Sequence, residues 1–332
     1  MNCYLYLQGY TSPTARRSLS IINGSGDGKS QAFRTTPAAE PQLNLDKTRP
    51  LPQAVLASYS HSMIEVQQLV KTYKETEALR NVSFTVPAGQ VCGYLGPNGA
   101  GKSTTVKILT GVLRPTSGVA RVAGFDVVEE SLEVKKRIGY VPETGTVYST
   151  LSANEYLALV GALHDMESEE IAERSAQMLE LFQLKDAADR RLDTLSKGMR
   201  QKVVISAALL HDPEVVLFDE PLSGLDANTA WLIKDIVRGL ADRGKTILYC
   251  SHILDVVERL CERVIILDRG EIVADGMTTE LLSSSKRATL ETLFRSLTAS
   301  EDNRELVGAF LASFNAERTN VQGDGKGEKK ND

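Results

Sequence analysis

The apolar side chains between Ile64 and Met277 follow two different periodicities. Short runs that are apolar throughout, or at every second position, indicate strands, and they lie at 83–86, 91–95, 119–122, 215–218, 246–250 and 264–267. Residues 150–185 place apolar side chains at helical spacing instead, and these include Tyr156, Leu159, Val160, Leu163, Ile171, Met178, Leu179 and Phe182. Strands that alternate with helices in this way predict an α/β domain with a largely parallel sheet.

The N-terminal segment breaks this pattern. Residues 1–62 contain five of the eleven prolines of the chain, among Ser, Thr, Gly and Gln residues and with little periodicity. Such a composition is typical of segments that bury too little apolar surface to fold. We therefore expect 1–62 to be a largely disordered extension, and the regular domain to span 63–282 with a helical subdomain at about 150–212.

The C-terminal segment is expected to be an appendage of this domain. Residues 283–321 predict a helical extension, with an amphipathic helix at 290–297 and a weaker helix at 304–314. The last residues, 322–332, are polar and are expected to be disordered.

Composition narrows the class of protein. The 332 residues are 42% hydrophobic and 24% charged, which fits a globular protein with one large core. No stretch approaches the roughly 18 uninterrupted apolar residues of a membrane-spanning helix, so any membrane function is expected to depend on a partner. The net charge of −5 and the lack of a dense Lys/Arg tract argue against a nucleic-acid partner. Four cysteines without CxxC spacing indicate neither a zinc site nor disulfides, which fits a reducing, cytoplasmic compartment.

A phosphate-binding loop follows the strand predicted at 91–95. The pattern GxxxxGK[ST] is filled at every required position by Gly96, Pro97, Asn98, Gly99, Ala100, Gly101, Lys102, Ser103 and Thr104. In this motif backbone N–H groups surround the phosphates, the lysine reaches the β- and γ-phosphates, and the hydroxyl of Ser103 ligates Mg²⁺. The residues after the loop read as a helix, so the phosphates would lie at a helix N-terminus. The chain is therefore expected to bind a nucleoside triphosphate.

Two adjacent acids end the apolar strand predicted at 215–218. Asp219 and Glu220 would lie at the carboxyl edge of the sheet, beside the phosphate-binding loop. We expect Asp219 to hold Mg²⁺, directly or through water, and Glu220 to act as the general base that orients the attacking water.

The order of the remaining motifs resembles that of ATP-binding-cassette (ABC) proteins. Residues 195–201, LSKGMRQ, are similar to the signature sequence of this family in its LSKGM form. Tyr73 stands where the family has an aromatic residue that stacks on adenine, Asp226 lies in a segment that resembles the D-loop, and His252 resembles the switch histidine. The resemblance covers about 63–277 and is strongest to the ATP-binding subunits of bacterial ABC-2-type exporters.

The resemblance implies a fold and an assembly. The fold would be a P-loop NTPase core with a mainly parallel sheet, an antiparallel β subdomain and a helical subdomain. Two such domains would form a head-to-tail homodimer with two ATP molecules between them, in which Ser196 and Gly198 reach the ATP held by the opposite protomer. His252 would hydrogen-bond the γ-phosphate and help to hold Glu220 and its water, and Asp226 would cross the dimer interface.

Glu143 departs from the usual family pattern, which has glutamine at this position. A carboxylate can still accept a proton from water or face Mg²⁺, but it adds negative charge near the phosphates. We interpret Glu143 as a tolerated variant that contacts the nucleotide and the metal and couples them to the transport partner.

The leading hypothesis is the ATPase subunit of a multi-component ABC transporter, which uses ATP and Mg²⁺ to power a separately encoded membrane permease for export. The subunit would be cytoplasmic and would lie on the inner face of the cell membrane through that permease. Two alternatives stay open: a soluble ABC ATPase that acts on DNA or ribosomes, and a regulatory cassette without transport activity. The segment between the phosphate-binding loop and the signature has no CxxC and no sustained heptads, which argues against the DNA-acting class.

Overall fold

The computed structural model describes residues 62–143, 147–285 and 287–298. The disorder expected for 1–62 and 322–332 and the helix expected at 304–314 fall outside these ranges, apart from Ser62, which begins the first strand. None of the helices in the described part combines the length and the apolar character that a bilayer crossing requires.

A six-stranded sheet forms the centre of the molecule, in the order β10-β9-β3-β8-β7-β6. Neighbouring strands are parallel except at one edge, where β10 runs antiparallel to β9. The strands are β3 (Val91–Leu95), β6 (Ile138–Val141), β7 (Val215–Asp219), β8 (Thr246–Cys250), β9 (Arg263–Asp268) and β10 (Glu271–Met277). The expected α/β fold with a mainly parallel sheet is therefore confirmed.

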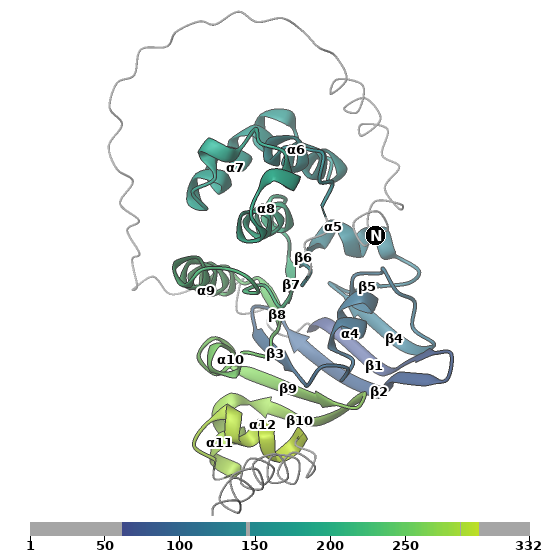
Figure 1. Cartoon of the computed structure of the whole chain (residues 1–332). Coiled ribbons are helices and arrows are strands. Elements are labelled where there is room, and N and C mark those ends of the chain that lie inside the picture. Colours follow the sequence, from purple (N-terminus) through teal and green to yellow (C-terminus); the bar gives the residue numbers. More distant parts are fainter. Residues whose placement is uncertain (1–61, 144–146, 286, 299–332) are drawn as a thin grey trace, which may run out of the picture.

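A second, antiparallel sheet lies beside the first, on the side of helix α4 (Figure 1). Its order is β2-β1-β4-β5, with β1 (Ser62–Tyr73), β2 (Thr76–Pro87), β4 (Ser117–Val122) and β5 (Phe125–Asp126). Helix α4 (Lys102–Leu109) packs between the two sheets, because its buried residues Val106, Ile108 and Leu109 join a core to which both sheets contribute.

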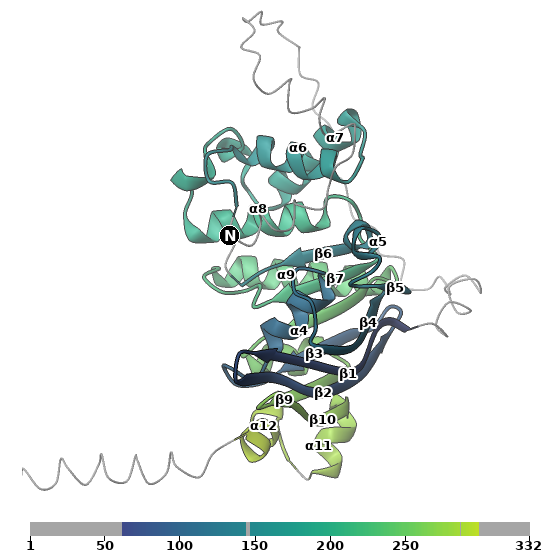
Figure 2. The same cartoon turned by 90° about the vertical axis from the view of Figure 1, so that its right-hand side faces the viewer.

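Three helices form a lobe at one end of the molecule in both views, and its helix α8 packs on β6 (Figures 1 and 2). They are α6 (Ala153–Leu163), α7 (Ser168–Leu181) and α8 (Lys197–Leu209), with short 3-10 turns at Lys185–Ala187 and Leu192–Thr194. Helix α6 begins with a capping box, in which Ser152 accepts from the Glu155 N–H and the Glu155 carboxylate accepts from the Ser152 N–H. The helical stretch expected at 150–185 contains α6 and α7.

The remaining helices surround the central sheet. They are α5 (Ser131–Arg137), α9 (Ala227–Asp242), α10 (Leu254–Leu260), α11 (Thr278–Ser284) and α12 (Leu290–Thr298). The C-terminal helix α12 is held by its Leu290 and Leu293 side chains, which are buried in the main core. Its Leu290 N–H also donates to the Glu258 carboxylate of α10 at 2.7 Å.

The central strands are buried on both faces, which explains their unbroken apolar runs. In β7, Val216 and Phe218 belong to one core cluster, whereas Val215 and Leu217 belong to the other. Alternate side chains of one strand thus support two cores, as expected for a parallel sheet covered on both sides.

The sequence analysis located strands β2, β3, β4, β7, β8 and β9 but did not identify β1, β5, β6 and β10, of which β5 has only two residues. Strand β1 has several register shifts against its neighbours, and Gln68 in it adopts a positive φ of 47°. These bulges interrupt the period-two pattern on which strand prediction depends. Strand β6 has only four residues, and β10 is an edge strand in which no residue is buried.

Candidate functional site

The expected phosphate-binding loop joins the end of β3 to the start of α4. Its backbone approaches neighbouring strands closely: a Cβ at Gly96 would collide with the Leu267 carbonyl oxygen. Gly101 has a φ of 111° and is the N-cap of α4, where a side chain would be 2.6 Å from the Ala78 carbonyl oxygen. A glycine cap cannot satisfy the first N–H groups of the helix by a side chain, so this helix end can receive an anion.

Lys102 is the first residue of α4 and is only 8% exposed. Its ammonium group donates to the carbonyl oxygens of Gly96 at 2.6 Å and Pro97 at 3.2 Å. The lysine therefore bridges the two ends of the loop and places a positive charge beside the N-terminus of α4. Such a buried cation attracts phosphate oxygens.

Asp219 lies at the end of β7 and is buried to 3% exposure. Its carboxylate accepts a hydrogen bond of 3.4 Å from the hydroxyl of Ser103 on α4. Burial raises the pKa of Asp219, and the nearby Glu143 and Glu220 carboxylates raise it further, whereas the Ser103 bond and Lys102 act in the opposite direction.

Glu220 follows immediately and turns the chain away from the sheet with a positive φ of 53°. Its N–H donates to the Cys250 carbonyl of β8 at 3.0 Å, which fixes the residue at the sheet edge. The Glu220 carboxylate accepts from Ser251 Oγ at 3.3 Å and lies 2.9 Å from His252 Nδ1. A buried carboxylate in contact with an exposed imidazole is an arrangement that can orient and deprotonate a water molecule.

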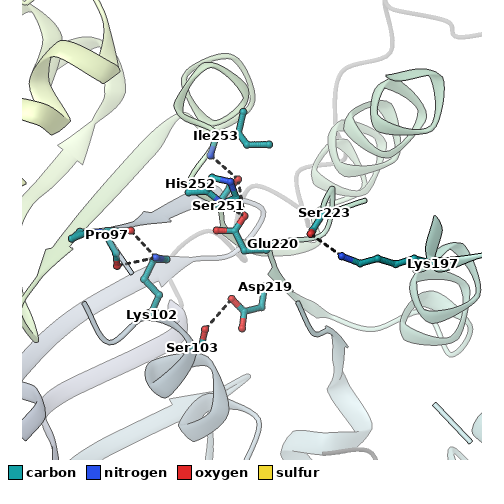
Figure 3. A network of polar contacts seen from close by, with 11 residues as sticks. Pro97, Lys102, Ser103, Lys197, Asp219, Glu220, Ser223, Ser251, His252 and Ile253 are labelled. Carbon is teal, nitrogen blue, oxygen red and sulfur yellow. Dashed lines mark hydrogen bonds and ion pairs between the residues drawn. The ribbon is translucent and has the colours of Figure 1, made fainter. Parts of the chain in front are cut away.

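These groups converge on one cavity of about 520 Å³ (Figure 3). Glu143 joins them from the loop after β6. The predicted site residues that line the cavity are Gly96, Pro97, Asn98, Gly99, Gly101, Lys102, Ser103, Thr104, Glu143, Asp219, Glu220 and His252. Ala100, which was also expected here, is buried and lies behind the loop, where its carbonyl accepts from the Gly270 N–H at 3.0 Å.

Four other expected site residues do not line this cavity. Tyr73 lies at the end of β1, is 44% exposed and has the Lys71 ammonium group 5.2 Å from its ring centroid. Ser196 is the N-cap of α8 and accepts from the Met199 N–H. Gly198 follows in the same helix, and Asp226 is the N-cap of α9, held by Thr229.

Two residues that line the cavity were not identified from the sequence. One is Ala78 of β2, whose carbonyl approaches Gly101. The other is Phe294 of α12, which brings a large aromatic side chain to the cavity wall. The amphipathic pattern at 290–297 correctly predicted a helix, but nothing in that pattern indicates which site the helix reaches.

The oxygen groups at the cavity suit a magnesium ion that is shared with phosphates. Ser103 and Asp219 supply a hydroxyl and a carboxylate that already lie in contact. Within the described residues, no group of three or more His, Cys, Asp and Glu side chains is arranged to hold a metal by itself. Mg²⁺ usually takes one or two protein oxygens and completes its shell with water and substrate phosphates, so this pair fits it.

Comparison with known proteins identifies relatives of the chain. Residues 79–223 match the family model described as ABC transporter. The chain is 40% identical to the ABC transporter ATP-binding protein NatA of Bacillus subtilis (strain 168), over 67% of this chain and 91% of NatA. It is 42% identical to the daunorubicin/doxorubicin resistance ATP-binding protein DrrA of Streptomyces peucetius, over 67% of each chain.

A solved structure with a similar fold is that of the ATP-binding cassette MJ0796, in a dimeric post-hydrolysis state bound to ADP and Pi. The TM-score is 0.61 at 27% sequence identity, and the match covers 65% of this chain and 99% of that one.

The raised pKa of Asp219 predicts a gain in stability when its charge is removed. An acid whose pKa is higher in the folded state stabilises that state below its unfolded pKa, and this contribution is lost as the pH rises through the folded pKa. At pH 7 we expect Asp219→Asn to raise the Tm of the nucleotide-free protein by about 2–4 °C. The difference should shrink as the pH falls toward 4, and a Tm decrease at pH 7 would contradict the assignment.

Phe294 is predicted to exclude water from the cavity. In Phe294→Ala we expect kcat/KM for ATP hydrolysis to fall about fivefold to tenfold. Water that takes the place of the ring would weaken the electrostatic interactions between the cavity residues and the phosphates. Leu297→Ala is the matched control, since Leu297 lies on the same helix, is 36% exposed and does not line the cavity. Steady-state kinetics with thermal melting of both variants test this, and equal kcat/KM values in the two would contradict it.

Proposed function

The chain belongs to the ABC transporter family as an ATP-binding ATPase, and from this membership we propose that it powers export through a separately encoded membrane permease. The observation that supports ATP hydrolysis as the source of this power is the Glu220–His252 contact at 2.9 Å, in a cavity that the phosphate-binding loop also lines. This arrangement supplies a phosphate cradle and a base on opposite sides of one space, which suits hydrolysis rather than binding alone.

The triphosphate would bind with its phosphates against the loop of residues 96–101. Backbone N–H groups of the loop and of the first turn of α4 would donate to the phosphate oxygens. Lys102 would turn from the Gly96 and Pro97 carbonyls toward the β- and γ-phosphates, a short movement for a side chain anchored in the same loop. Tyr73, exposed at the end of β1, would stack on the adenine ring.

Magnesium would be held by Ser103 and Asp219, with Glu143 facing the same cavity. When bound, the ion neutralises charge on the phosphate oxygens. The raised pKa of Asp219 reflects burial among other acids, and a cation at this position would favour its charged form. Glu143 also lies in the loop after β6, where we propose that the permease is sensed.

Glu220 would act as the base for the attacking water. As the water oxygen bonds to the γ-phosphorus, the bond from phosphorus to the leaving oxygen of ADP breaks, and the water proton passes to the Glu220 carboxylate. Ser251 and His252 hold this carboxylate from one side, so its free oxygen is oriented by two partners. His252, 67% exposed at its side chain, would also donate to the γ-phosphate.

We further propose that two copies of the chain associate head to tail. Ser196, Gly198 and Asp226 lie outside the cavity of their own chain, on the N-terminal ends of α8 and α9. A helix N-terminus attracts anions, so the end of α8 suits the γ-phosphate of an ATP held by a second copy. The dimeric state of the similar cassette MJ0796 supports this assembly.

The permease would be a separate polypeptide, and the chain would lie on the cytoplasmic face of the membrane through it. Export as the direction is supported by the relative DrrA, which is named for drug resistance, and by the LSKGM signature. ATP binding would close the dimer and hydrolysis would let it reopen, and this motion would be passed to the permease through the lobe of α6, α7 and α8.

Co-purification tests the permease directly. The tagged chain should copurify from gently solubilised membranes with a multi-span membrane protein in near-equal amount. Recovery with ribosomes or DNA, and without a membrane protein, would contradict the transporter assignment and favour a soluble ABC ATPase.

Replacement of the base should separate binding from turnover. In Glu220→Gln we expect kcat to fall at least about 100-fold, because an amide cannot accept the water proton. ATP binding should persist, since the phosphate-binding loop is unchanged, and ATP with Mg²⁺ should shift the variant to a dimer on size-exclusion chromatography. Phosphate release measures turnover, and a kcat near that of the wild type would show that Glu220 is not the base.

A further inference from the structure

Lys197 occupies a position where a lysine is electrostatically unfavourable. It is the first residue of α8, and the first turn of this helix contains no acidic residue. The positive end of the helix dipole repels a cation at this position. The side chain is exposed, so it is not kept there by burial in the core. Its contacts therefore give the best indication of its function.

The side chain of Lys197 extends to the loop that follows Glu220. Its ammonium group donates to Ser223 Oγ at 3.5 Å, and Figure 3 shows it reaching this hydroxyl from α8. Its methylene groups cover Gly224, where a methyl group would lie 3.1 Å from both Cδ and Cε. Gly224 has a φ of 79°, so the lysine stem lies on a backbone turn that a glycine permits.

Two further contacts join the same helix to the same loop. The buried amide of Gln201 donates to the Pro221 carbonyl at 3.5 Å. Gly198 lies against the loop as well, since a Cβ there would be 3.2 Å from the Gly224 carbonyl oxygen. The first turns of α8 thus contact the segment directly after Glu220 at three points along its length.

This segment also contacts Glu220, in addition to the bond from Glu220 to the Cys250 carbonyl. The Ser223 N–H donates to the Glu220 carbonyl at 3.2 Å, which closes a turn on the residue. Glu220 itself holds a positive φ of 53°, a conformation that costs free energy for a residue with a side chain. Contacts that hold the turn therefore help to keep the Glu220 carboxylate in contact with Ser251 and His252.

We propose that Lys197 is a positioning residue that links the signature helix to Glu220 of the same chain through Ser223. The inference rests on the proposed function, in which Ser196 and Gly198 meet ATP held by a second copy. Binding of that ATP would move the N-terminal turn of α8, and Lys197 would pass the movement to Glu220. One nucleotide site would thereby control catalysis at the other.

The test is steady-state ATP hydrolysis by Lys197→Ala, Lys197→Arg and a matched control. The control is Lys185→Ala, which removes an exposed lysine of the same lobe, in the 3-10 turn Lys185–Ala187. We expect Lys197→Ala to lower kcat about fivefold with little change in KM, and to bring the Hill coefficient close to one. Lys197→Arg should retain kcat and cooperativity, because arginine keeps the cation and a long stem.

Each outcome decides the inference. A Lys197→Ala variant that matches Lys185→Ala in kcat and Hill coefficient would overturn it, and so would a loss confined to KM. Equal Tm values for the two variants exclude unfolding as the cause of a lower kcat. If the wild type itself hydrolyses ATP with a Hill coefficient of one, the paired-site part of the proposed function fails, while the comparison of kcat still decides the role of Lys197.

Discussion

The parallel pairing of β3, β8 and β7 is the constraint on which the site depends. Tyr94 pairs with Cys250, and Cys250 pairs with Asp219, so the three strands end in one row. After each of these strands the polypeptide leaves the buried sheet at the same edge, where solvent can reach polar groups. The strand pairing alone therefore places three segments next to one another: the phosphate-binding loop, Glu220 and residues 251–252.

Features that depend on local sequence were predictable, and features that depend on long-range packing were not. The loop at 96–104 and the two acids at the end of β7 follow from residue type and strand position, so the sequence analysis identified them. Phe294 reaches the cavity only because α12 packs on α10, and the contact of Lys197 with Ser223 requires α8 to lie beside the loop after β7. No periodicity encodes either contact.

The site reduces the stability of the empty protein in several ways. Asp219 is a buried acid near two other carboxylates, and Glu220 holds a positive φ. Burial of like charges and backbone strain both cost free energy, and such costs concentrate where catalysis needs fixed geometry. A triphosphate and its cation would relieve part of this cost, because they satisfy Lys102, the N-terminus of α4 and the acids together.

The central claim is that each nucleotide site is completed by a second copy of the chain. Complementation between two inactive variants tests this claim most directly. Lys102→Ala removes the phosphate contact, and Ser196→Arg blocks the signature helix. In a head-to-tail dimer of one copy of each, one site combines both defects and the other has neither. Mixing the two variants should therefore restore part of the wild-type ATP hydrolysis, although neither variant hydrolyses ATP alone and the defective site no longer assists the intact one. If the mixture stays as inactive as its components, each site is formed within a single chain and the account is wrong.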